Sequence, residues 1–414
     1  MRKGVIGLMI LSLCLGGTGC YKEAGSETLG AANSQVIQKV EASESLAPSK
    51  LSESKTVAAE PVKSAGVKEE VKSITIASVG DIMMHDAQIK SGSLGNSKYD
   101  YSVMFKSIKP YIQKADFAVG NLETTLAGKD KKYTGYPMFN APEVLAKNIK
   151  DAGFDMVTTS NNHSLDRKFY GVTKTIENLD KAGLLHTGSY KTESDSKSIF
   201  IKDIKGVKVA FLSYTYATNG ITVPEKFAVN LINRGKIFED IKKAKALKAD
   251  MIIASMHFGV EYQVKQNKTQ EDLVNYLFKN GVDVVLGSHP HVLQPMEMKK
   301  VKDIYGVEKD RFVIYSQGNI VANMPSRYKN SGVIVNLNIK KDSKGTTIDK
   351  VEYVPTFVDS YYNSKAKKAT FEVLPLFSQS DYSSHPKSSI IKQSFKDSMG
   401  ILKSNSSKIK MMSK

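Results

Sequence analysis

Short apolar runs rich in β-branched residues alternate with longer amphipathic segments through the middle of the chain. Apolar runs between turn residues are typical of buried strands, whereas apolar residues spaced three or four apart indicate a helix that faces a core. The pattern predicts strands at 74–79, 117–119, 156–158, 207–212, 251–256, 282–286 and 312–315. It predicts helices at 101–114, 142–152, 170–182, 236–248 and 270–280.

Turn residues and the last apolar segments refine this picture. Gly153, Gly183 and Gly281 directly follow predicted helices, where glycine commonly forms a left-handed C-terminal cap. Segments 332–339 and 346–354 alternate apolar and polar residues with no helix between them, which predicts an antiparallel hairpin. We therefore expect a layered α/β domain with a mixed sheet, and 414 residues suffice for one such domain with tails.

The first twenty residues have the pattern of an export signal. Arg2 and Lys3 precede an apolar run at 5–15, and small residues then lead to Cys20. The run is shorter than the roughly 20 apolar residues that a membrane span needs. A cysteine after small residues resembles a bacterial lipoprotein box, although Gly17 stands where that box usually has leucine. We predict that Cys20 is lipidated and anchors the protein at the outer face of the bacterial cell membrane. An ordinary cleaved signal or an uncleaved anchor is the alternative.

Polar segments flank the predicted domain, which we place at 73–360. Residues 21–72 are dominated by Ser, Glu, Ala, Lys and Val, cannot bury enough apolar area to fold, and predict a flexible tether. Residues 361–414 are rich in lysine and serine and predict a polar, basic tail. Within that tail, Tyr382 and the pair Ile390-Ile391 could form a short docked helix.

Cysteine content and charge limit the chemistry. The two cysteines, Cys14 and Cys20, both lie in the leader, so the exported part has no disulfide and no thiolate ligand. Any metal ion must therefore be held by nitrogen and oxygen. The formal charge of +17 favours polyanionic partners. Export disfavours nucleic acid and leaves anionic lipid headgroups, wall polymers and other anionic surface polymers as candidates.

Side chains that can bind metal follow the predicted strands directly or within a few residues. In layered α/β folds, ligands collect at the carboxyl ends of the strands. Imidazole, carboxylate and amide oxygen suit Zn, Mn or Fe, so the sequence predicts a divalent metal centre of uncertain identity and number. The residues concerned are Asp81, Asn121, Asn162, His163, His257, His289 and His291.

Each candidate also has a purely structural interpretation. Asp81 could cap a turn, and His257 could be a buried histidine with satisfied hydrogen bonds. Glu261 and Asn319 are candidates for the lining of the pocket, with turn hydrogen bonding almost as good an explanation. His85 is expected in a loop near the site rather than on the metal. The strongest local signal is the pair of histidines around Pro290, which stiffens the turn between them.

Five motifs carry a family resemblance over roughly residues 73–360. They are Gly-Asp-Ile-Met at 80–83, Asn-Leu-Glu-Thr at 121–124, Asn-Asn-His-Ser-Leu-Asp at 161–166, His-Phe-Gly-Val-Glu at 257–261 and Ser-His-Pro-His-Val-Leu-Gln at 288–294. In this order they resemble the calcineurin-like metallophosphoesterases, and more narrowly the CapA-type proteins of poly-γ-glutamate capsule synthesis. The resemblance implies a layered sandwich of mixed sheets flanked by helices.

The resemblance also implies roles for individual residues. The positions that match metal ligands are Asp81, Asn162, His257, His289 and His291. His163 matches a catalytic histidine that acts as an acid or stabilises the transition state. Asp166 could orient its imidazole by accepting the second N–H.

Two departures from the family pattern put a standard two-metal centre in doubt. The usual Asp-x-His at the first motif is absent, because Ile82 and Met83 follow Asp81. Asn121 stands where an aspartate should bridge two ions, and a neutral amide cannot offset the repulsion between two dications. Glu123 is the candidate for supplying the missing charge, so we include both Asn121 and Glu123 among the predicted metal residues.

Two functional hypotheses follow. In the first, the protein acts at the membrane in the synthesis or export of poly-γ-glutamate, together with membrane capsule proteins. This hypothesis does not require its metallophosphoesterase-like site to be catalytic. In the second, it is a metal-dependent hydrolase of a phosphoester or polymer amide at the cell surface, not dedicated to capsule.

Overall fold

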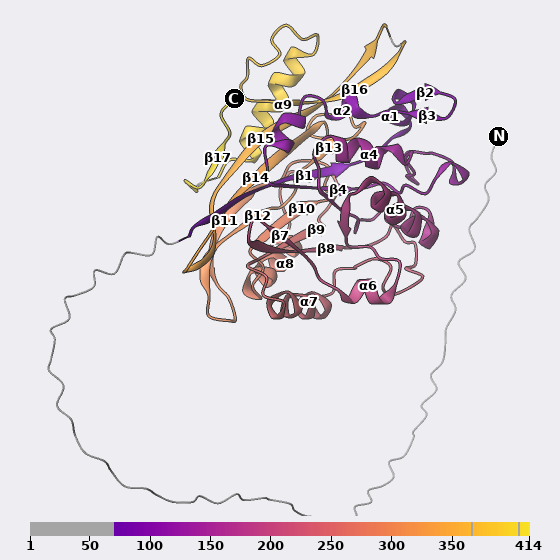
Figure 1. Ribbon diagram of the computed structural model, residues 1–414. Helices are drawn as coiled ribbons and strands as arrows, with labels where there is room; N and C mark the ends of the chain where they lie inside the picture. The colour runs from indigo at the N-terminus through magenta and orange to yellow at the C-terminus, as the bar shows by residue number, and fades with distance from the viewer. Residues whose placement is uncertain (1–69, 366, 405) are drawn as a thin grey trace, which may run out of the picture. The chain divides into compact units, whose positions relative to one another are not determined.

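The computed structural model describes residues 70–365, 367–404 and 406–414, which form a layered α/β structure (Figure 1). The larger sheet has the order β16-β15-β14-β1-β4-β5-β6, with β13 beside β1 and β17 beside β15. Its strands are β1 (Lys72–Ile82), β4 (Phe117–Leu122), β5 (Met156–Thr158), β6 (Leu185–Thr187), β13 (Asn319–Val321), β14 (Ser331–Asp342), β15 (Gly345–Asn363), β16 (Lys368–Pro375) and β17 (Ile409–Met411).

The second sheet has the order β11-β12-β10-β9-β8-β7. Its strands are β7 (Phe200–Ile204), β8 (Val207–Thr215), β9 (Met251–His257), β10 (Val284–Ser288), β11 (Met296–Lys302) and β12 (Glu308–Ile314), and a small hairpin pairs β2 (Ser93–Gly95) with β3 (Lys98–Tyr99). The helices are α1 (Asp86–Ser91), α2 (Ser102–Phe105), α3 (Lys109–Gln113), η1 (Lys129–Lys131), α4 (Val144–Asp151), α5 (Lys168–Ala182), α6 (Glu193–Lys197), α7 (Arg234–Ala246), α8 (Lys268–Lys279) and α9 (Ser388–Ile401).

Both sheets are mixed, and their inner faces share one core. Strands β1, β4, β5 and β6 run parallel, as do β8, β9, β10 and β12, while the other pairings in the two sheets are mostly antiparallel. Alternation along β1 sends Ile76 into the core between the sheets and Ala77 to the opposite face, under the helices. The predicted α/β sandwich of mixed sheets flanked by helices is confirmed.

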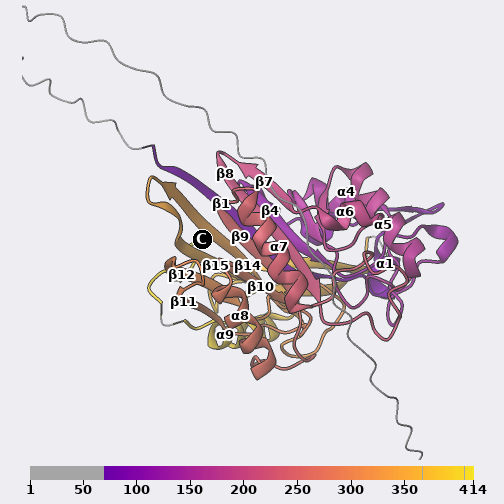
Figure 2. The same ribbon diagram turned by 90° about the horizontal axis from the view of Figure 1, so that it is seen from below.

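Helices cover the outer faces of the two sheets (Figure 2). Helices α2, α3 and α4 contribute Phe105, Ile112 and Leu145 to the core on the larger sheet. Helices α7 and α8 contribute Ile241 and Leu277 to the core on the smaller sheet. Each helix is amphipathic because it buries one face against a sheet and leaves the other in water.

The predicted strands are all present with shifted ends, and the predicted hairpin is formed by β14 and β15. The continuous helix expected at 101–114 is wrong, because the chain forms the two short helices α2 and α3 there. Pro110 explains the break. It lacks a backbone N–H and occupies the first turn of α3, a position that proline favours because no helical hydrogen bond is lost.

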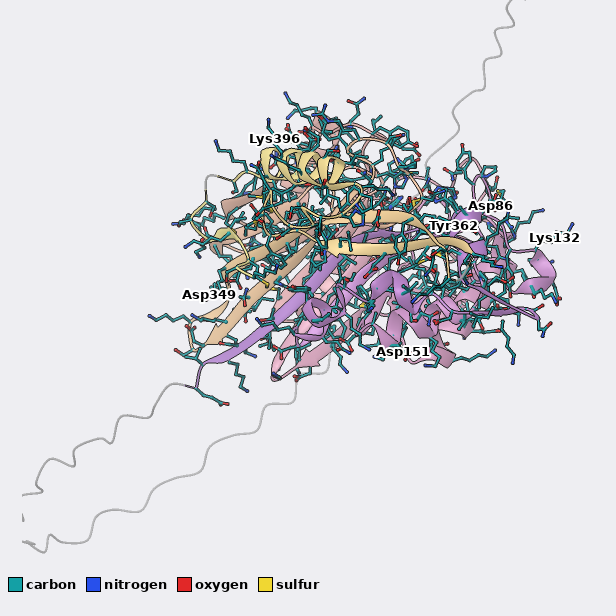
Figure 3. All side chains as sticks on the ribbon, turned by 90° about the horizontal axis from the view of Figure 1, so that it is seen from above. Asp86, Lys132, Asp151, Asp349, Tyr362 and Lys396 are labelled. Atoms are coloured by element: carbon teal, nitrogen blue, oxygen red, sulfur yellow. The ribbon has the colours of Figure 1, made fainter. Side chains whose placement is uncertain are left out.

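The polar tail expected at 361–414 is wrong for most of its length, whereas the short docked helix expected around Ile390-Ile391 is present as α9. Strand β15 continues to Asn363, β16 and β17 pair with β15, and α9 packs beside it (Figure 1). Apolar side chains anchor the segment, since Phe371 is buried in the main core and Ile391 lies in a cluster under α9. Many lysines and serines face water, as Lys396 does on the outer side of α9 (Figure 3), so average composition hid a folded segment.

The leader 1–20 with Cys20 and most of the tether 21–72 lie outside the described residues. Within residues 70–365, 367–404 and 406–414, no helix combines the length and apolarity needed to cross a bilayer.

The neighbouring isoleucines of α9 provide a matched test of the docked C-terminal segment. Ile391 is 1% exposed and Ile390 is 49% exposed. We expect Ile391→Ala to lower the free energy of unfolding by about 2–5 kcal/mol, because it leaves a cavity in a packed core. Ile390→Ala should change it by less than about 1 kcal/mol. Urea unfolding checks both values, and equal small effects would contradict docking of α9.

Candidate metal centre

The predicted ligands meet where parallel strands of the two sheets end. Asp81 is the next-to-last residue of β1 and lies beside Asn319 of β13, and His257 ends β9 beside Ser288 of β10. Gly80 permits the close packing at the end of β1, because a Cβ there would lie 2.0 Å from the carbonyl oxygen of Gly318. The ends of both sheets therefore place ligand-type side chains in one buried cluster.

The Asp81 carboxylate accepts hydrogen bonds from several neighbouring groups. Its Oδ1 accepts a bond of 2.8 Å from Asn121 Nδ2, and its Oδ2 lies 3.3 Å from the backbone N–H of His289 and 3.2 Å from His291 Nδ1. Asp81 is fully buried. Its charge is thus spread over several donors, as a buried carboxylate requires.

Asn319 fixes the imidazole of His291. Its side-chain oxygen lies 3.2 Å from His291 Nδ1, and its amide donates to the carbonyl oxygens of His291 and Lys329. Since both Asn319 and Asp81 offer acceptors to Nδ1, that nitrogen carries the proton. The lone pair of Nε2 then points to Glu123, whose Oε1 is 3.7 Å away. Partners of this kind hold a metal-binding histidine in the right tautomer.

Glu123 has no hydrogen-bond partner on either carboxylate oxygen, although its side chain is fully buried. Its Oε1 lies 3.6 Å from His257 Nε2 and 3.7 Å from His291 Nε2. Burial, and then the neighbouring Asp81 carboxylate, raise the pKa of Glu123 well above its usual range. An unpaired buried carboxylate is costly unless a proton or a cation neutralises it.

His257 lies between the two sheets with both ring nitrogens engaged. Nε2 is 2.7 Å from the side-chain oxygen of Asn162, and Nδ1 is 2.9 Å from the hydroxyl of Ser288. Burial, and then the nearby imidazoles of His289 and His291, hold the pKa of His257 well below its usual range. The ring is therefore neutral. Because the Ser288 hydroxyl can either donate or accept, it supports either tautomer and allows Nε2 to bind a metal ion.

The His-Pro-His turn is held in a rare backbone conformation. His289 has a φ of 98° and His291 a φ of 56°, a region that side chains other than glycine seldom adopt. The backbone N–H of Tyr262 donates to the carbonyl oxygen of Pro290 over 2.8 Å and secures the turn. Burial, and then repulsion from His291, lower the pKa of His289 to about 3, so this ring is also neutral. Such local strain is often found where a site must be shaped.

Asn121 is oriented as a donor and not as a ligand. Thr158 donates its hydroxyl hydrogen to the amide oxygen over 3.1 Å, which turns the amide nitrogen toward Asp81. The same nitrogen lies 3.4 Å from His257 Nδ1. In this orientation the amide nitrogen of Asn121 faces Asp81 and its oxygen faces Thr158, and its role as a metal ligand stays a prediction.

His163 and Asp166 form a buried pair at the edge of the cluster. His163 Nδ1 donates to Asp166 Oδ2 over 2.7 Å, and the backbone N–H of Phe139 donates to the same oxygen. The ring of Phe139 packs edge-on against His163 at 4.6 Å. Nearby, the side-chain nitrogen of Asn162 donates a hydrogen bond of 3.1 Å to the side-chain oxygen of Asn219. This bond fixes the Asn162 amide so that its oxygen faces His257.

The remaining predicted residues lie farther out. His85 is at the N-cap of α1, and its ring lies edge-on to Phe139 with the centroids 5.2 Å apart, so Phe139 contacts both His85 and His163. Glu261 is partly exposed and lies near His289. Sequence reasoning missed the orienting roles of Ser288, Thr158 and Asn219. Ser288 adjoins a recognised motif, whereas nothing in the pattern around Thr158 or Asn219 marks them.

The residues present fit a divalent ion. Asp81, Glu123 and His291 place one ligand atom each within 4.8 Å of one another. Atoms bound to one zinc ion at about 2.1 Å lie roughly 3.0–3.5 Å apart, so the separations of 3.6 and 3.7 Å around Glu123 need to close by only a few tenths of an ångström. The neutral imidazole of His257 completes a set of nitrogen and oxygen donors around an unpaired carboxylate.

Comparison with known proteins identifies the family. Residues 75–324, more than half of the chain, match the family described as "Bacterial capsule synthesis protein PGA_cap". The chain belongs to this family. Among capsule synthesis proteins, it is 31% identical to "Capsule biosynthesis protein CapA" of Bacillus anthracis over 292 residues, which cover 68% of this chain and 66% of that one. It is 26% identical to "PGA biosynthesis protein CapA" of Bacillus subtilis (strain 168) over 287 residues, covering 67% and 72%.

Solved structures with a similar fold have lower sequence identity to this chain. The NAD nucleotidase NadN of Haemophilus influenzae has a TM-score of 0.45 and 14% identity over 83% of this chain and 57% of that one. The calcineurin-like phosphoesterase YfkN from Bacillus subtilis has a TM-score of 0.40 and 15% identity over 80% of this chain and 99% of that one.

The donor role of Asn121 predicts the effect of restoring a carboxylate. Asn121→Asp sets a second negative charge against Asp81 Oδ1 and should destabilise the metal-free protein at pH 7 by about 1–3 kcal/mol. Added Mn²⁺ should remove most of that cost. Thermal unfolding with and without metal checks both effects, with Asn121→Ala as a control that loses the hydrogen bond but adds no charge. A variant that metal does not rescue would contradict this arrangement.

The raised pKa of Glu123 predicts that removing its charge stabilises the metal-free protein but prevents metal binding. Glu123 holds its proton more tightly in the folded protein than in the unfolded chain. The free energy of unfolding therefore falls as the pH rises from the ordinary glutamate pKa toward the raised value. Glu123→Gln should therefore raise the melting temperature of the metal-free protein at pH 7 and flatten that decline. It should also abolish stabilisation by Mn²⁺ or Zn²⁺.

Thermal scans from pH 5 to pH 8 compare Glu123→Gln with Glu297→Gln, which removes a partly exposed carboxylate that pairs with Lys299 on β11. The control should melt as the wild type does. If Glu123→Gln were less stable than the wild type without metal, the buried charge would not be the dominant cost.

Proposed function

We propose that this protein acts in the synthesis or export of poly-γ-glutamate at the outer face of the bacterial membrane, and that it does so through a divalent metal centre. One observation carries the proposal: in a domain of the capsule synthesis family, the Glu123 carboxylate, which has no hydrogen-bond partner, lies between the imidazoles of His257 and His291. Scaffolding alone does not require such a costly buried charge.

The residues that would hold the ion are Glu123, His257 and His291, with Asp81 and Asn162 beside them. A bound Zn, Mn or Fe ion supplies a Lewis acid and lowers the pKa of its water. To bind metal, His257 must give up the hydrogen bond from Nε2 to Asn162 and take the tautomer with its proton on Nδ1, and the Ser288 hydroxyl would then accept a hydrogen bond from Nδ1. This coupling makes metal affinity depend on Ser288 as well as on the ligands.

His163 supplies a proton-transfer group next to the centre. Its Nδ1 donates to Asp166, and its Nε2, which lies 3.4 Å from the side-chain nitrogen of Asn219, can give or take a proton. Phe139 packs against the ring and fixes its orientation. The pair supports hydrolysis of a phosphoester or of a polymer amide. This is the observation that favours the second candidate, a surface hydrolase not dedicated to capsule.

The partners follow from charge and from the leader. A net charge of +17 supports attraction to an anionic polymer or to a membrane surface. The proposed lipid anchor at Cys20 would hold the domain near the membrane proteins that make capsule. Nucleic acid is not a proposed partner, because the proposed leader would direct the chain out of the cell.

Complementation tests the proposal. In a strain that lacks the gene, we expect Asp81→Asn to lower surface poly-γ-glutamate by at least about tenfold, the effect expected when a metal site is disrupted. Glu297→Gln, a surface carboxylate outside the cluster, should restore normal polymer. Polymer is measured at the cell surface and in the medium, and membrane fractions confirm equal protein levels.

The outcomes separate the two candidate functions. Full polymer with Asp81→Asn at normal protein levels would contradict a metal-dependent role in capsule formation. Turnover of a generic phosphodiester by purified protein, together with normal polymer in the strain without the gene, would favour the surface hydrolase instead.

A further inference from the structure

A cavity of about 550 Å³ opens on the outer face of the larger sheet, far from the candidate metal centre. It is bounded by α3, by strands β1, β14 and β15, and by residues 412–414. Thr75 of β1 lines it, whereas Asp81 lies near the other end of the same strand, about 20 Å away. We propose that this cavity holds a segment of an anionic polyamide chain, separately from the metal centre. The inference rests on the proposed function, because it takes the capsule polymer as the partner.

Asn336 forms the floor of the cavity. Along β14, Val335 and Leu337 face the core between the sheets, so Asn336 faces the opposite side. Asn336 is 3% exposed and is the only buried residue among those that line the cavity. Its Oδ1 is buried and has no hydrogen-bond partner in the part of the chain that the structure describes. Because a buried acceptor without a donor is costly, we expect a ligand that donates a hydrogen bond here.

The polar neighbours of Asn336 are paired with one another. The hydroxyl of Thr75 donates to Oδ1 of Asn338 over 3.1 Å, and Nδ2 of Asn338 donates to Oε2 of Glu352 over 3.1 Å. The other carboxylate oxygen of Glu352 lies 2.9 Å from Nζ of Lys350. These contacts join β1, β14 and β15 without using the side-chain oxygen of Asn336. A role in holding the sheet together therefore does not account for Asn336.

Lys114 brings an unpaired positive charge to the rim of the cavity. It directly follows α3, is exposed, and forms no ion pair within residues 70–365, 367–404 and 406–414. The other two lysines of the rim have acidic partners, since Lys350 pairs with Glu352 and Lys414 lies 3.8 Å from Asp381. An ammonium group without a counter-ion beside a cavity favours an anionic ligand.

The two features together select the class of ligand. An anion whose oxygens only accept hydrogen bonds can pair with Lys114 but cannot satisfy Oδ1 of Asn336. A neutral glycan can donate hydroxyl hydrogens to Asn336 but leaves Lys114 unpaired. Each repeat of γ-linked glutamate carries an amide N–H and a carboxylate, and so can satisfy both groups. The aliphatic carbons of the repeat can pack on Tyr111 and Met412, which also line the cavity.

A holding site away from the metal centre suits a polymer. A small molecule occupies one site at a time, whereas a long chain can contact the protein at the cavity and at the centre together. The second contact is then intramolecular, which raises the overall affinity without a tight contact at either place. We therefore expect the cavity by itself to bind a short oligomer weakly.

Fluorescence anisotropy with a labelled oligo-γ-glutamate tests the inference on the purified full-length protein, kept free of metal with a chelator. Asn336→Ala should weaken binding about two- to tenfold, the usual effect of losing one hydrogen bond. Lys114→Gln should weaken it about two- to fivefold, the range of an exposed ion pair. Lys109→Gln removes the same charge from the start of α3, outside the cavity, and should bind as the wild type does.

Polyphosphate and dextran, the latter a neutral glycan, are the comparison probes. Polyphosphate binding should depend on Lys114 but not on Asn336, and dextran should not bind. Equal melting temperatures of the variants check folding, and the exposed Lys114→Gln keeps the test decisive if Asn336→Ala does not fold.

Two results would overturn the proposal. One is equal affinity of the wild type and every folded variant for oligo-γ-glutamate. The other is tighter binding of polyphosphate or dextran through Asn336, which would assign the cavity to a different class of polymer. Binding through Asn336 and Lys114, together with normal capsule in a strain without the gene, would contradict the proposed function but support this site.

Discussion

The neutralisation of one buried carboxylate is the constraint on which the candidate site depends. Glu123 is fully buried, has no hydrogen-bond partner and lies close to the buried Asp81. Asp81 is satisfied by donors from Asn121, His289 and His291, but Glu123 is not. Without a cation it must hold a proton, and with one it becomes a ligand. The imidazoles of His257 and His289 are neutral, because burial lowers the pKa of each, and so they can bind a metal ion instead of pairing with the charge.

The polar groups of the site lie at the ends of strands that are otherwise apolar, and the packing of those strands offsets the free-energy cost of burying the polar groups. Parallel strands β1 and β4 of one sheet and β9 and β10 of the other deliver their last residues to the same place. The core between the sheets and the two helix-covered faces hold the strands in register. Preorganisation of the ligands by a rigid framework is what permits a strained turn such as 289–291 to persist.

The sequence predicted much of this arrangement, because period-two strands and strand-end ligands are local signals. Asp81, His257 and His291 could be placed from their strands alone. The orientation of Asn121 could not, since it depends on the Thr158 hydroxyl, which comes from a different strand. The C-terminal segment was misjudged because burial of Phe371 and Ile391 depends on tertiary packing that average composition does not reveal.

The most direct test of the account is an anomalous difference map from crystals of the protein grown with Mn²⁺ or Zn²⁺. The account predicts a peak at coordination distance, about 2.0–2.2 Å for zinc, from Glu123 and from at least one of His257 and His291. No peak at Glu123 with either metal at saturating concentration, while its carboxyl group remained buried, would contradict the claim that a metal ion neutralises this charge.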